Sequence, residues 1–277
     1  MSVIHSKAMI AQLSISKWSA TKMDRQITDE IEQTHGASNA GRFTKTLVSK
    51  ALLKPVDAVF TDIRNNHQMM TQPWGDNGDR LLPSKLFKQY SDVQRALKTK
   101  LATTVAAMVQ QYPHEVLAAK TRLGSMHDPL DYPDPADLAA KYSVNITIVQ
   151  VPSAADFRVD VADDEAEEIR KQIAATVAGK QQNAVKATYQ RIKDVVEKIY
   201  QRCDDPMQTF KDSLINNAAD LCSVLEGLNL TDDPAITTLH KQISEQLLVP
   251  PSQLRTDMAL RARTAKHAKK ILESLPT

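Results

Sequence analysis

The sequence predicts a mainly α-helical fold: a multi-helix bundle with a long central helix and one small antiparallel β-hairpin at about residues 144–161. Apolar residues recur at helical spacing along most of the chain, most persistently from Asp163 to about Arg202. Only 7 of the 277 residues are glycine, which suits a protein built from long helices. Hydrophobic residues make up 42% of the chain, enough to bury a core.

The N-terminal part carries a short strand signal followed by a helix signal. Leu13 and Ile15 alternate with polar residues, which predicts an edge strand within residues 9–18. Apolar residues at helical spacing predict an amphipathic helix over residues 19–34, and the polar, glycine-containing residues 35–41 form the turn that ends it.

Two prolines are expected to interrupt the helices that follow. Pro55 should divide one helical stretch into two, because proline removes a backbone N–H and clashes with the preceding turn. After a loop over residues 71–83, Ser84 is expected to cap a long helix that ends at Tyr112, and Pro113 to begin another.

Aspartate followed by proline occurs four times, and three of the copies precede a helical pattern. Aspartate at the N-cap and proline at the first helical position form a strong helix-start signal. The three copies are Asp134-Pro135, Asp205-Pro206 and Asp233-Pro234.

The clearest strand signal in the sequence runs from Val144 to Val151, where apolar and polar residues alternate. Residues 157–161 alternate again after a tight connection, so we interpret the two segments as an antiparallel hairpin, with the strand around Leu13 as a third neighbour. A two-stranded ribbon is marginally stable alone, so the hairpin should pack on helices.

The C-terminal half is expected to consist of helices only. The helix from Asp163 would span about 60 Å, and it serves either as a spine that joins two lobes or as half of a helical hairpin with residues 207–225. Further helices are predicted over residues 232–248 and 254–275.

We expect two domains: residues 1–249, a helical core with the inserted β-hairpin, and residues 250–277, a Pro-Pro spacer with a basic C-terminal helix. Pro250 and Pro251 should end the preceding helix and isolate the last one. Deletion of residues 255–277 is therefore expected to leave the fold intact.

The charge of the chain is unevenly distributed. The formal net charge is +2, yet residues 255–277 hold six cations and two acids, whereas residues 156–168 hold seven acids and one arginine. A near-neutral protein with a cationic C-terminal segment is able to hold a polyanion locally. The alternative is a solvated amphipathic helix. Docking on a membrane surface is disfavoured, because the apolar face is rich in alanine and lacks Trp and Phe.

Two further basic stretches, residues 80–100 and 180–202, have aromatic residues among their cations, an arrangement that suits stacking on unpaired bases. The alternative is that their cations form ordinary helix surfaces. The ring of Phe87 is expected in the core. The candidate nucleic-acid-binding residues are Arg255, Arg261, Arg263, Lys266, Lys269 and Lys270 in the C-terminal segment, Lys85, Lys88, Tyr90 and Lys98 in the second stretch, and Lys186, Tyr189 and Arg191 in the third.

No catalytic, cofactor or metal motif is recognisable, so we expect a non-enzymatic protein without cofactors. Glycine-rich phosphate loops and G-x-S-x-G are absent, and no two histidines have i, i+4 spacing. The acids from Asp163 to Glu168 are explained by the dipole of the helix that begins there. Asp76 and Asp79 are too few for a calcium loop and should instead pair with Arg80.

Cys203 and Cys222 are expected to be reduced core thiols, since neither has a second ligand at metal spacing. Trp74 lies in a loop with proline and glycine neighbours. It is either inserted into the core or presented to a partner, and the sequence does not decide between these.

Four stretches resemble a family of phage-encoded proteins, the single-stranded-DNA-binding RNA polymerase cofactors of Schitoviridae-type podophages. They are ISKWSATKMD from Ile15, PWGDNGDRLLP from Pro73, VPSAADFRVD from Val151 and FKDSLINNA from Phe210. The resemblance implies an early phage protein of unusual helical fold that helps the phage's own RNA polymerase engage DNA. It supplies no residue motif for DNA contact. The C-terminal cationic segment lies outside the four stretches, so its role is inferred from charge alone.

The function predicted from the sequence is non-catalytic, sequence-independent binding of single-stranded DNA that assists the phage RNA polymerase in the host cell cytoplasm. The alternatives are a protein-interaction adaptor, as a partner of a phage ATPase or a host-takeover factor, and a virion structural protein. The sequence contains no run of 18 apolar residues, so no membrane span is predicted. No secretory signal is expected at the N-terminus. The oligomeric state is left open, a homo-oligomer included.

Overall fold

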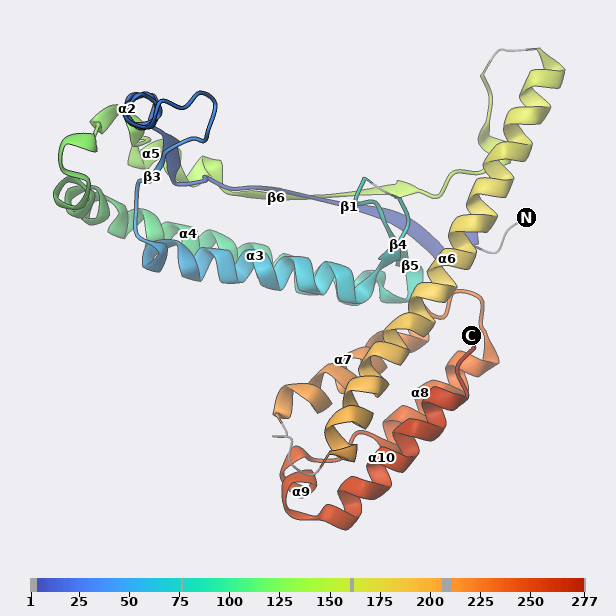
Figure 1. Cartoon of the computed structure of the whole chain (residues 1–277). Coiled ribbons are helices and arrows are strands. Elements are labelled where there is room, and N and C mark those ends of the chain that lie inside the picture. The colour runs from blue at the N-terminus through green and yellow to red at the C-terminus, as the bar shows by residue number, and fades with distance from the viewer. Residues whose placement is uncertain (1–3, 76, 160–161, 206–210, 277) are drawn as a thin grey trace. The chain divides into compact units, whose positions relative to one another are not determined.

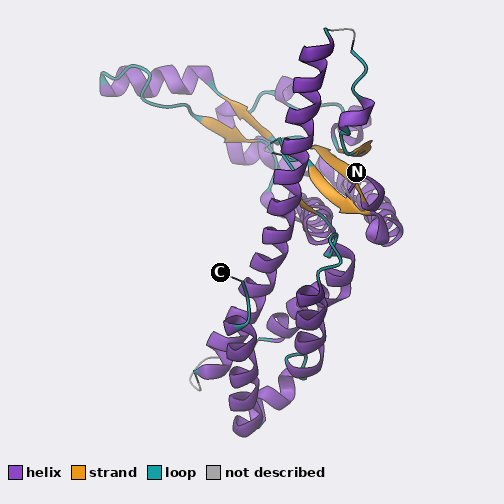
Figure 2. Cartoon of the chain, turned by 90° about the vertical axis from the view of Figure 1, so that its right-hand side faces the viewer, coloured by secondary structure: helices purple, strands orange, loops and turns teal. Residues whose placement is uncertain are grey.

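A computed structural model shows a mainly α-helical chain with short strands, as predicted (Figures 1 and 2). It describes residues 4–75, 77–159, 162–205 and 211–276. The helices are α1 (Ile4–Lys7), α2 (Arg25–His35), α3 (Lys50–Met70), α4 (Phe87–Leu123), α5 (Pro135–Leu138), α6 (Asp163–Asp204), α7 (Asp212–Leu228), α8 (Pro234–Gln246), α9 (Pro251–Thr256) and α10 (Met258–Glu273). The strands are β1 (Ala8–Ser16), β2 (Thr21–Met23), β3 (Thr44–Thr46), β4 (Gln72–Pro73), β5 (Arg80–Pro83) and β6 (Ser143–Gln150).

The chain forms two compact units, each assembled from separated segments. Unit 1 consists of Met1–Leu13, Asn66–Ser91 and Ile146–Thr277, and unit 2 of Ser14–Asn65 and Asp92–Asn145. The structure therefore gives no domain boundary at residue 250. The chain passes between the units within β1, α3, α4 and β6.

A four-stranded sheet has the order β4-β5-β1-β6, and β1 pairs antiparallel with β5 so that Ala8 faces Pro83. The strand around Leu13 is thus confirmed, but it is interior to the sheet rather than at its edge.

The predicted hairpin has to be corrected at its second strand. The predicted strand at 144–151 exists as β6, and its neighbour in the sheet is β1, the strand around Leu13 that was expected as a third member. Residues 157–159 are not a strand, and residues 160–161 lie outside the described part of the chain. Val159 is 62% exposed, so this segment buries no apolar face that would favour pairing.

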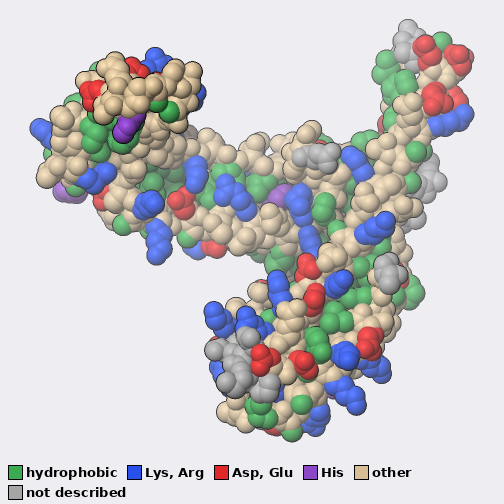
Figure 3. All heavy atoms as spheres, in the orientation of Figure 1, with side chains coloured by type: hydrophobic (Ala, Val, Ile, Leu, Met, Phe, Trp, Pro, Cys, Tyr) green, Lys and Arg blue, Asp and Glu red, His purple; other side chains and the backbone are tan. Residues whose placement is uncertain are grey.

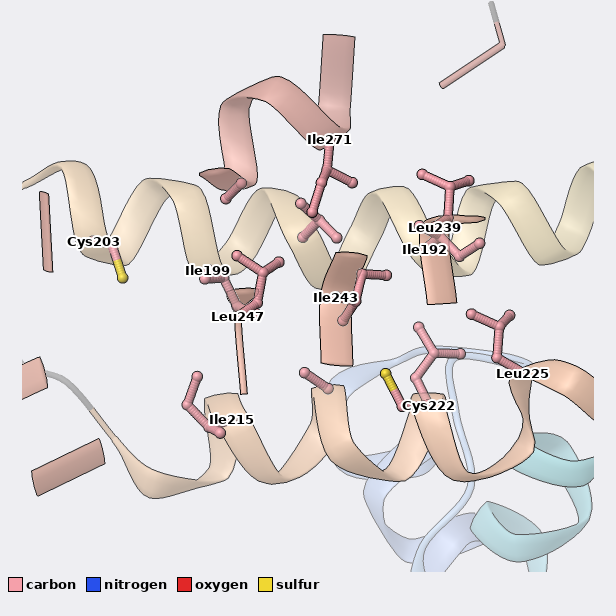
Figure 4. Close-up of a cluster of buried hydrophobic side chains, with 14 of the residues drawn as sticks. Ile192, Ile199, Cys203, Ile215, Cys222, Leu225, Leu239, Ile243, Leu247 and Ile271 are labelled. Carbon is pink, nitrogen blue, oxygen red and sulfur yellow. The ribbon is translucent and has the colours of Figure 1, made fainter. Parts of the chain in front are cut away.

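The C-terminal helices α6, α7, α8 and α10 enclose one apolar core (Figure 4), to which α9 adds Leu254. Of the two roles considered for the long helix, packing beside α7 is observed. Cys203 and Cys222 are buried in this core and are not bridged, as predicted. Burial raises the pKa of the Cys203 thiol to about 11, so its sulfur behaves as an apolar group at neutral pH.

The C-terminal helix is part of this core and not a separate appendage. Ala265, Ala268 and Ile271 of α10 are 4%, 0% and 2% exposed and pack against the other helices. Pro251 does not act as a spacer, because it occupies the first position of α9, where proline is tolerated. Asp257 then ends α9 and caps α10, so the predicted helix over 254–275 is interrupted. Removing residues 255–277 would open the core, contrary to expectation.

A second core cluster surrounds the N-terminal half of α6. It joins Ile4 and Ile10 to Leu81, Val177 and further buried residues of unit 1. Trp74 belongs to this cluster at 6% exposed, and the Lys180 ammonium lies 5.2 Å from its ring centroid. The loop tryptophan is therefore inserted into the core.

Neither of the two prolines ends a helix. Pro55 is the sixth residue of α3, so it removes only one backbone bond near the helix start. Pro113 lies inside α4 at an exposed position of the helix. Ser84 begins a short 3-10 turn that leads into α4, without a side-chain cap at the preceding residue.

The Asp-Pro signals predict helix starts correctly wherever both residues are described. The carboxylate of Asp134 accepts a hydrogen bond from Ala136 N at 2.8 Å, and that of Asp233 from Ala235 N at 2.9 Å. Asp205-Pro206 cannot be judged, because Pro206 lies outside the described residues. The helix predicted from residue 207 appears from Asp212 onward.

In unit 2, the two-stranded antiparallel sheet of β2 and β3 is fixed by one buried lysine. The Lys45 ammonium is 2.8 Å from an Asp131 oxygen, 3.3 Å from an Asp24 oxygen, and donates to the Met126 carbonyl at 2.7 Å. The hydrogen bond with Asp131 is the largest influence on the pKa of Lys45, which is raised. A buried ammonium with three oxygen partners holds the segments that carry these oxygens together.

Candidate nucleic-acid interface

Four cations of α10 remain exposed because the other side of the helix is buried. Thr264, Ala265, Ala268 and Ile271 face the core, which turns the charged positions outward. We call these exposed cations the α10 cation row: Arg263, Lys266, Lys269 and Lys270. No carboxylate of the described chain forms an ion pair with any member of the row. Figure 3 shows Lys and Arg side chains gathered along this part of the molecule.

Arg261 is not part of the row, and its prediction as a DNA contact is wrong. The residue is 5% exposed, and its guanidinium donates to the main-chain carbonyls of Arg202 and Asp205. Carbonyls at the C-terminal end of a helix lack intrahelical partners and carry partial negative charge, so a buried arginine stabilises the end of α6.

Arg255 is exposed but forms an ion pair with Asp212 at the start of α7. Its charge is therefore partly compensated within the protein. Of the six C-terminal cations predicted to bind DNA, the four of the α10 cation row keep an uncompensated, accessible charge.

The second basic stretch offers exposed cations but not the predicted ring. Lys85 and Lys88 are exposed, although Lys85 lies 3.6 Å from Asp232. Tyr90 is 1% exposed and its hydroxyl lies 2.8 Å from His67 Nδ1, so it cannot stack on a base. Burial also raises the pKa of Tyr90. Phe87, which we expected in the core, is 41% exposed.

The remaining member of this stretch, Lys98, is half-buried and belongs to unit 2.

The third stretch is mostly structural. The Tyr189 hydroxyl donates to Asp233 at 2.7 Å, and the half-buried ring packs against the C-terminal core. Burial first, and then the bond with Asp233, raises the pKa of Tyr189 to about 12. Lys186 is exposed on α6 and remains a candidate.

The prediction that Arg191 contacts DNA is corrected for the same reason as for Arg261, because its guanidinium binds main-chain carbonyls. Its guanidinium donates to the Gln68 carbonyl at 2.8 Å and the Met69 carbonyl at 3.1 Å, at the end of α3. Arg80 also reaches this helix end, with its Nε 2.6 Å from Thr71 Oγ1. Burial first, and then the nearby Arg80 charge, lowers the pKa of Arg191 to about 10.

Arg80 was expected to pair with Asp76 or Asp79. It caps α3 instead, and Asp79 accepts a hydrogen bond from Gln12 at 2.9 Å. Asp76 lies outside the described residues.

A basic pocket between α6 and α7 was missed by the sequence analysis. Its volume is about 260 Å³, and its described lining contains no carboxylate. We call this site the basic pocket, lined by Lys198, Gln201, Arg202, Lys211, Ser213, Leu214 and Asn217. Lys198 and Arg202 share one helix face at i, i+4 spacing, but the sequence gives no signal that Lys211 joins them.

A larger cavity of unit 2, of about 740 Å³, has a different character. Its lining combines the lysines Lys22 and Lys45 with the acids Asp24, Glu30 and Asp131. Mixed charge makes it a poor site for a polyanion.

Two further properties of the described residues bear on function. Across residues 4–75, 77–159, 162–205 and 211–276, no three His, Cys, Asp or Glu side chains are grouped to hold a metal ion. Within the same ranges, no helix has the length and apolar character that crossing a membrane requires.

The chain matched no protein-family model, no curated protein and no solved structure. The resemblance to the phage cofactor family therefore stays a prediction from four sequence stretches.

Proposed function

We propose that this protein binds single-stranded DNA without sequence preference and without catalysis, and that the α10 cation row is its main contact. The observation that carries the proposal is this row, four exposed cations without carboxylate partners in the described chain, on a helix anchored in a core. A fixed line of charge fits a phosphate backbone at little ordering cost.

Charge should outweigh stacking in this interaction. Aromatic residues make up only 5% of the chain, and two proposed stacking rings, Tyr90 and Tyr189, are engaged inside the protein. Neutralising about four phosphates of a single strand predicts a slope of log K against log salt near −3. Affinity should then fall roughly 150-fold between about 50 and 300 mM salt.

The role in transcription rests on the resemblance alone. We propose that the bound strand is presented to the phage's own RNA polymerase in the host cytoplasm. Transcription of a single-stranded template by that polymerase should increase when the protein is added, and a variant without the α10 cation row should not produce the increase.

The DNA-binding proposal is tested by fluorescence anisotropy with a labelled oligonucleotide of about 20 nucleotides. The test variant replaces the α10 cation row by glutamine, which changes the net charge from +2 to −2. The matched control makes the same change of net charge at four exposed lysines elsewhere, Lys54, Lys120, Lys171 and Lys241. Circular dichroism verifies that both variants are folded.

We expect the test variant to bind at least tenfold more weakly than the wild type, with a salt slope smaller by about 3. The control variant should stay within about threefold of the wild type. Equal losses in both variants would show that only net charge matters, and binding that is indifferent to salt would refute the phosphate contact.

An adaptor function is the second candidate, and one observation favours it. At the edge of the sheet, β6 exposes Ile148 and Val149 to 39% and 38%. An exposed edge strand with apolar side chains is able to pair with a strand of another protein. No oligonucleotide binding at low salt would favour this function over DNA binding.

A further inference from the structure

We propose that the basic pocket binds one phosphate group of the bound DNA strand, so that the strand is held there by directed hydrogen bonds. This inference rests on the proposed function and assigns a second, distinct contact to it. The pocket lies in unit 1, between the C-terminal part of α6 and the first turns of α7.

The chemistry of the lining suits an oxyanion. Three cations converge with the neutral polar side chains of Gln201, Ser213 and Asn217, while Leu214 is the apolar member of the described lining. An arginine guanidinium and lysine ammonium groups are the side chains that bind phosphate best, and amides and hydroxyls supply further donors. The volume of about 260 Å³ far exceeds the roughly 30 Å³ that one water occupies, so a phosphate group fits.

Lys211 occupies a position that the helix dipole does not favour for a cation. Arg202 lies in the last turn of α6, where a cation stabilises the negative end of the helix dipole. Lys211 is instead at the N-cap of α7, where the dipole disfavours a cation. An anion bound beside Lys211 would offset this unfavourable interaction.

The walls of the pocket are held in place from outside. Arg261 donates to the carbonyls of Arg202 and Asp205 and so fixes the end of α6. Asp212, the acid next to Lys211 in sequence, is already paired with Arg255. Its carboxylate is thus directed to another partner, and neither Lys198 nor Lys211 forms an ion pair with a carboxylate of the described chain.

The first experiment uses inorganic phosphate as the probe and the isotope-labelled full chain. Amide chemical shifts of Lys211, Ser213 and Leu214 should change in a saturable manner, and chloride at matched ionic strength should not reproduce the changes. In the double variant Lys198→Gln/Lys211→Gln, the apparent Kd for phosphate should rise at least tenfold. A matched control, Lys193→Gln/Lys241→Gln, removes two exposed lysines that do not line the pocket and should bind phosphate like the wild type.

The second experiment repeats the anisotropy titration with both double variants. Loss of one phosphate contact should lower the salt slope by about 1 and weaken oligonucleotide binding severalfold in the pocket variant only. If the pocket variant binds phosphate as well as the wild type, the inference is overturned.

The two proposals fail in different ways. If phosphate binding is lost in the pocket variant but oligonucleotide affinity is unchanged, the strand assignment is wrong, while the α10 cation row still stands. If the wild type binds phosphate but no oligonucleotide, both the strand assignment and the proposed function are refuted.

Discussion

Two arginines of α10 show that neighbouring cations have different tasks. Arg261 and Arg263 are two residues apart, which on an α-helix of 3.6 residues per turn places them about 200° apart. Arg261 is therefore buried and caps α6, while Arg263 is exposed. A count of cations along the sequence combines residues that bind the protein's own carbonyls with residues accessible to DNA.

A buried histidine makes the stability of unit 1 depend on pH. His67 is 4% exposed, and desolvation first, then the nearby Arg80 charge, lowers its pKa from 6.5 to about 4. The unfolded chain thus binds a proton more readily than the folded one between these values. As the pH is lowered from 7 to 4, the free energy of unfolding should therefore decrease by about 3 kcal/mol because of this group.

Urea unfolding of the wild type and of His67→Gln at several pH values tests this prediction. The variant should be less stable at pH 7 but should lose about 3 kcal/mol less on acidification. His114→Gln, a substitution at an exposed histidine, serves as the control for the exchange of histidine by glutamine. Parallel pH curves for the wild type and His67→Gln would contradict the assignment.

At the scale of elements, the packing of α7 depends on a glycine. A Cβ at Gly227 would lie 2.4 Å from Leu86 Cγ, and Leu86 is itself only 5% exposed. Gly227→Ala should therefore lower the free energy of unfolding by about 1–3 kcal/mol through overpacking, although alanine is the better helix former.

Gly179 in α6 is the matched control, because nothing lies within 4 Å of a Cβ there. Gly179→Ala should raise stability by about 0.5–1 kcal/mol, the difference in helix propensity. Chemical unfolding of both variants measures the two values. A stabilising Gly227→Ala would show that the Leu86 side chain moves aside at no cost.

Most elements were predictable because their signals are local. The periodicity of α6 and the aspartate caps of α5 and α8 depend on residues a few positions apart. The strand around Leu13 was expected only as a third neighbour of a local hairpin. Its place as the sheet neighbour of β6 depends on segments more than 120 residues apart in the chain. Pro55 and Pro113 were misjudged because tolerance of a proline depends on its place in the helix and on solvent access.

The candidate site was predictable only in part, for the same reason. Exposure of the α10 cation row follows from the periodicity of its own helix. The basic pocket requires Lys198 and Lys211 to meet through the packing of two helices, and burial of Tyr90 depends on a contact with His67. Such contacts join residues distant in sequence and leave no pattern in either segment.

At the scale of the whole molecule, the two clusters of unit 1 share α6 but differ in their dependence on the N-terminus. The cluster around Trp74 needs Ile4, Ala8 and Ile10, whereas the buried residues of the C-terminal core all lie between Ile192 and Ile271. The N-terminal segment should therefore support one half of α6 and not the other.

Deletion of residues 1–11 tests this division. Amide hydrogen exchange should accelerate around Val177 and Ala184, which lose their apolar neighbours, while Ile192 to Ile199 stay protected. Uniform acceleration along α6 would show that the helix opens as one cooperative unit.

The charge order along α6 has a consequence for the approach of a strand. Acids occupy its first turn, whereas from Lys193 to Asp204, about 60 Å away at most, three cations balance three acids. A polyanion therefore repels one end of this 42-residue helix and not the other, which produces a torque. Within a Debye length, about 10 Å at 0.1 M salt, that torque turns the acidic end away, so a larger share of collisions begins in a productive orientation.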